Sequence, residues 1–177
     1  METEGTLSPE SLATARAAFE SAGPTAKQVV REAAKAMAFD REEYRERVTG
    51  EVVERARNVL FADQLAVTIG SRAEFDAWVD EHPDYEVITL GSDDVDRVAW
   101  HAAPFAETAV AATFQNEREA AVGTLRKQAF SRLYRPKFEV DSDGSSADDD
   151  SQTSDTDSET SDSGNEADSS TETSGPE

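Results

Sequence analysis

The composition of the chain changes sharply near Val140, and this change limits the part that can fold. From Asp141 to Glu177 the sequence is almost wholly Ser, Thr, Asp, Glu and Gly, with no Lys, Arg or aromatic residue. A segment without apolar side chains cannot bury enough surface to offset the entropy lost on ordering. We therefore predict one folded domain over residues 1–140 and a disordered acidic tail over residues 141–177.

The first sixty residues show the apolar spacing of helices. Ser8 and Pro9 have the residue types of an N-cap and a first helical position, and the Gly23-Pro24 pair predicts the end of that helix. A second helix is expected over residues 25–38. A third begins at Asp40, with Glu43 completing a capping box. Gly50 either kinks this third helix or divides it in two. Its apolar stripe consists of Tyr44, Val48, Val52, Ala56 and Val59.

From Leu65 onward the apolar residues alternate, which is typical of strands. Strands are predicted over residues 65–69, 85–90, 97–102 and 108–114, and the last two are spaced as a hairpin. A short helix with a Ser71/Glu74 capping box separates the first two strands. A long helix capped by Asn116 and Glu119 follows the fourth strand, and Pro136 is expected to end it. The order predicts an α+β domain in which N-terminal helices and a long C-terminal helix pack on a small, mainly antiparallel four-stranded sheet.

The charge of the chain restricts its partners. The net charge is −21, from 38 acidic and 17 basic residues. The tail holds 13 of the acidic residues, which leaves 25 acidic against 17 basic, or −8, in residues 1–140. Such a surplus repels nucleic acid and anionic membranes. The basic residues are 13 Arg and only 4 Lys, and an acidic chain poor in Lys suits molar salt, where charges are screened.

The start of the chain predicts its location. Residues 1–4 carry no basic segment, and no apolar run follows them, so no secretory signal is expected. No stretch approaches about 18 consecutive apolar residues, the length that spans a membrane. We therefore predict a cytoplasmic protein without membrane contact.

Few residues could carry chemistry. The chain has no Cys and two His, and no motif supplies metal-ligand spacing, so we predict no metal, no cofactor and no catalytic residue. The best candidate binding pair is Arg97 and His101, which share one face of the third predicted strand, opposite Val98 and Trp100. If Trp100 faces the core, this pair lies on an open sheet face, where it could hold an anion or act as acid and base.

A second candidate lies on the last predicted helix. Between Ala120 and Phe138 the sequence has no acidic residue, and this is the one positive segment of the chain. It could dock nucleic acid or an acidic partner. Its charges could equally complement the C-terminal helix dipole and attract the acidic tail, which is the interpretation we favour. The basic residues are Arg126, Lys127, Arg132, Arg135 and Lys137.

Three stretches carry a resemblance to a known family. They are Val48–Glu54, Arg97–Pro104 with its Trp-His-Ala-Ala-Pro run, and Ala129–Arg135. Together they resemble a small haloarchaeal family of uncharacterised proteins, a domain of unknown function, over roughly residues 1–136. The resemblance implies a haloarchaeal, cytoplasmic origin and brings no activity or site residue.

Three functions remain open from the sequence. The first is a non-catalytic binding or regulatory module that acts through protein–protein contacts, with an unidentified protein partner. The second is a small enzyme or ligand-binding domain that uses the sheet face of Arg97 and His101. The third is a nucleic-acid-associated factor that uses the basic C-terminal helix, which the net charge makes the least expected.

Overall fold

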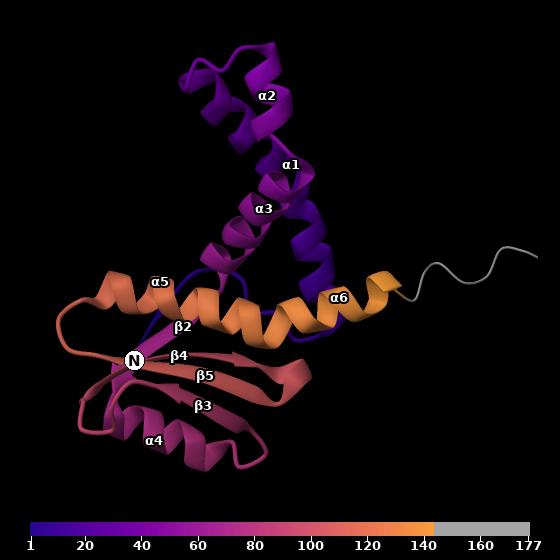
Figure 1. Ribbon diagram of the computed structural model, residues 1–177. Coiled ribbons are helices and arrows are strands. Elements are labelled where there is room, and N and C mark those ends of the chain that lie inside the picture. Colours follow the sequence, from indigo (N-terminus) through magenta and orange to yellow (C-terminus); the bar gives the residue numbers. More distant parts are fainter. Residues whose placement is uncertain (144–177) are drawn as a thin grey trace, which may run out of the picture. The chain divides into compact units, whose positions relative to one another are not determined.

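The computed structural model describes residues 1–143 of the chain, so the predicted tail from residue 144 onward lies outside the described residues. Figure 1 shows the arrangement of the elements. The helical elements are α1 (Leu12–Ala36), α2 (Arg41–Arg47), α3 (Gly50–Gln64), α4 (Arg72–Glu81), the 3-10 turn η1 (Pro104–Ala106), α5 (Arg118–Ala129), the π-helical turn η2 (Phe130–Tyr134) and α6 (Arg135–Asp143). The strands are β1 (Glu2–Glu4), β2 (Val67–Ser71), β3 (Glu86–Leu90), β4 (Arg97–Ala103) and β5 (Thr108–Phe114). The fold is α+β, as predicted.

The sheet has five strands in the order β1-β2-β4-β5-β3, one more than the four predicted. All neighbouring strands are antiparallel except β3 and β5, which pair in parallel. The hairpin of β4 and β5 is confirmed, with Arg97 opposite Phe114 and Ala103 opposite Thr108. The missed strand is β1. It has only three residues and no alternating apolar pattern, so pairing with β2 alone makes it a strand.

Both faces of the sheet are covered, and Figure 1 shows α5 and α4 on opposite sides. Val98 and Trp100 point toward α4 and pack with Phe75. Ala99 and Ala103 point the other way, into the larger core formed with α1, α3, α5 and η2. The predicted alternation along β4 is therefore confirmed, but the predicted open face is wrong. A sheet whose two faces are both apolar has to be covered twice.

The first helix begins later and runs further than predicted. Ser11, rather than Ser8, is its N-cap, and its side chain accepts a hydrogen bond from the Thr14 amide. Pro24 lies inside α1 instead of ending it. Proline in a helix interior costs about 3 kcal/mol. Ala22 and Ala26 on either side of it are buried, because α1 packs along α3, and this packing outweighs the cost.

The third predicted helix is divided in two, one of the two outcomes expected from Gly50. Asp40 and Glu43 form the predicted capping box of α2. Thr49 then caps α3, with Gly50 as its first residue. The apolar stripe of this segment does not enter the core: Val52 is 37% exposed and Val59 58%. The core side chains of α3 are instead Phe61 and Ala62.

The last helix also continues past its predicted end. The predicted Asn116 cap is wrong, because Glu117 is the N-cap of α5 and no side chain caps it. Proline cannot donate to the preceding turn. The helix widens into the π-helical turn η2 just before Pro136. There the Arg135 amide donates a hydrogen bond to the carbonyl of Phe130, five residues earlier. Helix α6 then reaches Asp143, three residues past the predicted boundary of the domain.

Candidate functional site

The structure separates the two members of the predicted sheet-face pair. Arg97 is exposed at the start of β4, and its guanidinium lies 5.7 Å from the centroid of the Phe114 ring. His101 is only 2% exposed, because α5 and η2 cover this part of the sheet. Four residues along a strand span about 13 Å. The two side chains share a face, as predicted, but they do not form one accessible site.

His101 instead belongs to a buried polar network with Tyr134. Its Nδ1 lies 2.7 Å from the Ala66 carbonyl oxygen, and its Nε2 lies 2.7 Å from the Tyr134 hydroxyl oxygen. A carbonyl only accepts, so Nδ1 carries the proton and Nε2 accepts from the tyrosine hydroxyl. Burial, with a smaller contribution from the Arg126 charge, lowers the pKa of His101, and burial raises the pKa of Tyr134. Both groups are therefore neutral at pH 7.

This network has the properties of a structural connection. Both ring nitrogens of His101 are occupied, and the hydroxyl of Tyr134 has its acceptor. Neither residue lines the cavity beside Phe19 and Phe130 or the one beside Leu90 and Phe114. A satisfied buried network specifies a unique core arrangement. Here it ties β4 to the π-helical turn and to the segment that leads into β2.

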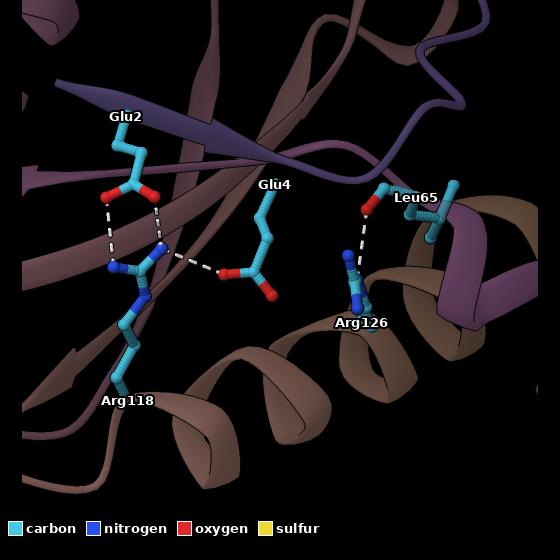
Figure 2. Close-up of polar contacts among 5 residues, drawn as sticks. All are labelled: Glu2, Glu4, Leu65, Arg118 and Arg126. Atoms are coloured by element: carbon cyan, nitrogen blue, oxygen red, sulfur yellow. Dashed lines mark hydrogen bonds and ion pairs between the residues drawn. The ribbon is translucent and has the colours of Figure 1, made fainter.

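The basic residues of the last helix do not form one surface. Arg126 is 12% exposed on its side chain and donates to the Leu65 carbonyl at 3.0 Å, as Figure 2 shows. It also lies 3.4 Å from Asp63. Arg132 donates to Gln128, and Arg135 pairs with Glu139 at 2.8 Å. Lys127 and Lys137 are exposed. Two of the five positive charges, those of Arg126 and Arg135, are therefore paired with carboxylates of the protein itself.

A further arginine of this region, which the sequence analysis did not select, holds the N-terminal strand. Arg118 donates to both carboxyl oxygens of Glu2 and to Glu4, at 2.8–2.9 Å (Figure 2). These bonds and the guanidinium charge lower the pKa of Glu2. Gly5 follows with a φ of +99°, and a Cβ there would collide with the Leu65 carbonyl oxygen. No sequence pattern links residues more than a hundred positions apart, so this contact required the fold.

One cavity of about 750 Å³ lies among α1, α3, η2 and α6. Aromatic side chains and an equal number of Arg and Glu residues line it, together with Asn58. Arg57 stacks on Phe19, with 3.9 Å between its guanidinium carbon and the ring centroid, and it also donates to the Phe19 carbonyl. The lining residues are Arg16, Phe19, Glu20, Glu54, Arg57, Asn58, Phe130, Arg135, Phe138 and Glu139. The lining charges sum to zero, so they do not single out an anionic or a cationic ligand for this cavity.

The most unusual surface belongs to residues 25–60, which we call the helical arm: the second half of α1, all of α2 and most of α3. Only Ala26 and Ala34 are buried in it. It holds 8 basic and 7 acidic residues, a net charge of +1, whereas residues 1–24 and 61–140 hold 9 basic and 18 acidic, a net charge of −9. Its exposed large apolar side chains are Val29, Met37, Tyr44, Val52 and Val59.

The apolar side of α3 is the candidate site that these observations define. Val52 and Val59 are seven residues apart and lie on one side of the helix, with half-buried Ala56 between them. Phe61 lies about 200° around the helix from Val59 at 100° per residue, and therefore faces the opposite way. The helical spacing was visible in the sequence. That the stripe faces outward was not, because spacing alone does not say which side is covered.

The fold and this surface define a class of protein: a small α+β domain with a mixed five-stranded sheet and an exposed apolar helix face. Residues 6–135 match a family described as Family of unknown function (DUF5809), and the chain belongs to that family. Neither a curated protein nor a solved structure matches the chain. Within residues 1–143, no helix is long and apolar enough to cross a membrane.

Proposed function

We propose that this protein is a non-catalytic binding module that acts through protein–protein contact, and that the apolar side of α3 is its binding face. The observation that carries the proposal is the exposure of Val52 and Val59 at helical spacing, on the side of α3 away from the core. An apolar helix stripe normally faces a partner element. In residues 1–143 no element covers these two side chains enough to bury them.

The charge distribution supports the same face. Residues 1–24 and 61–140 carry a net charge of −9, and an acidic protein partner would be repelled there. The helical arm is close to neutral, so a partner can approach it without that repulsion. Ion pairs within α3, such as Glu51 with Arg55, are already satisfied and leave no isolated charge beside the stripe.

The two other functions have less support. An enzyme or ligand-binding site at Arg97 and His101 lacks an open face, since His101 is buried and both its nitrogens are bonded. A nucleic-acid interface on the last helix lacks a continuous positive surface, since Arg126 and Arg135 are paired with Asp63 and Glu139. Backbone phosphates are bound by several basic side chains acting together.

We also propose that the module works in the cytoplasm of a salt-loving archaeon. A net charge of −8 over residues 1–140 opposes compaction until salt screens it. The near-ultraviolet circular dichroism of the protein should therefore be lost below a few hundred millimolar KCl and restored in molar KCl. An unchanged spectrum in dilute buffer would contradict the halophilic origin.

The binding face is tested by quantitative affinity capture in molar salt with three tagged baits: the natural chain, Val59→Asp and Thr124→Asp. Thr124 is an exposed, β-branched residue within α5, so its substitution is a matched control. We expect a protein that is retained by the natural and Thr124→Asp baits and reduced about tenfold or more with Val59→Asp, since a buried charge costs at least about 1.4 kcal/mol. Identical capture by all three baits would overturn the proposal.

A further inference from the structure

We infer that the partner of the α3 face is a second copy of this chain, bound through an antiparallel pair of α3 helices about a two-fold axis beside Ala56. The inference rests on the proposed function, and it names the occupant of the same face. Its basis is the symmetry of the stripe. Val52 and Val59 are seven residues apart, so a two-fold axis midway between them, level with Arg55 and Ala56, places Val52 of each copy against Val59 of the other.

The dimensions of the stripe suit this contact. Val52 and Val59 lie about 10.5 Å apart along the axis of α3, because seven residues of an α-helix rise by that distance. In the dimer, Val52 of one copy and Val59 of the other would bury each other at each end of the helix pair. The central residue is small, and small side chains allow two helix axes to approach to about 8 Å, the short end of the usual range. Ala56 is half-buried within one chain, so its side chain protrudes less than those of Val52 and Val59.

The charge distribution is compatible with a second copy at this face. Two copies carry the same charges, so acidic surfaces of the two chains repel each other. Residues 1–24 and 61–140 have a net charge of −9, whereas the helical arm, at +1, is close to neutral, so two arms can meet with little net repulsion. Arg55 lies next to Ala56 and is paired with Glu51 of its own chain, so it brings no isolated positive charge to the axis.

The size of the face sets the expected affinity. A single helix pair, to which each chain contributes two Val side chains, buries less than the area of about 1,200 Å² typical of stable complexes. The dimer should therefore be weak and concentration-dependent. Salt that screens the acidic surfaces and strengthens apolar burial should favour it.

The full-length chain is tested by sedimentation equilibrium in molar KCl over a wide range of protein concentration, together with Val59→Asp and the control Thr124→Asp. We expect reversible dimerisation of the natural chain and of Thr124→Asp. In Val59→Asp, where each dimer loses two equivalent contacts, the dissociation constant should rise by about tenfold or more. Circular dichroism of all three proteins checks that the substitutions leave the fold intact.

A cross-linking experiment tests the position of the axis. The chain contains no Cys, so Ala56→Cys introduces one thiol, and the two-fold axis brings it next to its own copy. A disulfide needs Cα atoms within about 7 Å. Ala56→Cys should therefore form a covalent dimer on mild oxidation much faster than Thr124→Cys. Val59→Cys alone should be slow, and a mixture of Val52→Cys and Val59→Cys should cross-link into mixed dimers.

The outcomes separate this inference from the proposed function. A monomer at every concentration, combined with Val59-dependent capture of a different protein, overturns the second copy and leaves the binding function standing. A monomer without any Val59-dependent capture overturns both. A dimer that Val59→Asp leaves unchanged, or equal cross-linking of Ala56→Cys and Thr124→Cys, places the contact elsewhere and overturns this inference.

Discussion

The two parts of the described chain obtain their structure in different ways. The sheet and its covering helices contain the large buried side chains, among them Tyr134, Phe61 and Trp100. The helical arm buries only Ala26 and Ala34, and its helices depend on caps such as Asp40 and on ion pairs along their surfaces. The sheet region is stabilised by burial. The arm leaves apolar side chains exposed, which is the property on which the proposed binding function rests.

The largest difference between the two regions should appear when a core aromatic is removed. Trp100→Ala should lower the free energy of unfolding by roughly 3–5 kcal/mol, because a 2% exposed side chain on the α4 side of the sheet would leave a cavity. Chemical denaturation in matched molar salt measures the change. Val59→Ala in the arm is the control. A loss below about 1 kcal/mol for Trp100→Ala would show that this side of the sheet is loosely packed.

His101→Ala should be the next most damaging change, at about 2–4 kcal/mol. The sequence predicts an exposed His101, whose substitution by Ala would cost little stability. In the structure, however, His101 is buried. The substitution leaves a cavity and removes the partner of both the Tyr134 hydroxyl and the Ala66 carbonyl. Tyr134→Phe, which removes only the hydroxyl, should cost about 1 kcal/mol. Equal stability of His101→Ala and the natural chain would contradict the buried network.

Pro24→Ala should have the opposite sign. Pro24 is exposed in the interior of α1 and cannot donate a hydrogen bond to the preceding turn. Alanine restores that donor, so we expect stabilisation by about 1–2 kcal/mol after the loss of the rigidity of proline in the unfolded chain. Denaturation curves of Pro24→Ala and of the neighbouring exposed control Thr25→Ala provide the comparison. A destabilised Pro24→Ala protein would indicate that α1 needs a bend at this point.

The pH dependence of stability should come from the sheet region. Burial lowers the pKa of His101 in the folded state, so below the ordinary value of 6.5 the unfolded chain binds a proton that the folded chain does not. The contribution of neutral His101 to the free energy of unfolding is complete above pH 6.5. It decreases as the pH falls below that value, by up to about 1.4 kcal/mol per pH unit. In His101→Gln this slope should disappear. If the stability of the natural chain and of His101→Gln changed with pH in the same way, a neutral buried His101 would be contradicted.

The smallest effect should be found in the arm. Val59→Ala and Val52→Ala remove exposed methyl groups, and alanine is the better helix former, so each should change the stability of the monomer by less than about 0.5 kcal/mol. The measurement is made at a protein concentration below that of self-association. A loss above about 1 kcal/mol would mean that the α3 stripe is covered within one chain, and the contrast between the two regions would fail.

Local signals in the sequence determined much of the secondary structure. Asp40 with Glu43 and Ser71 with Glu74 form the predicted capping boxes, because each box depends on residues three positions apart. The β4–β5 hairpin and the alternation of Trp100 and His101 were also predictable, since side chains alternate along any strand. The predicted breaks at Pro24 and Pro136 were wrong, because packing outside the helix decides whether proline is tolerated.

Only the tertiary structure decided which faces are covered. Spacing groups Val52, Ala56 and Val59 on one side of a helix, and Arg97 with His101 on one side of a strand, but it carries no information about what lies opposite. Burial depends on residues distant in sequence: Tyr134 covers His101 from 33 positions away, and Arg118 holds Glu2 from 116. The sequence therefore determined most of the elements and which of their residues share a side. The packing of distant segments determined that the sheet face is closed and the α3 face is open.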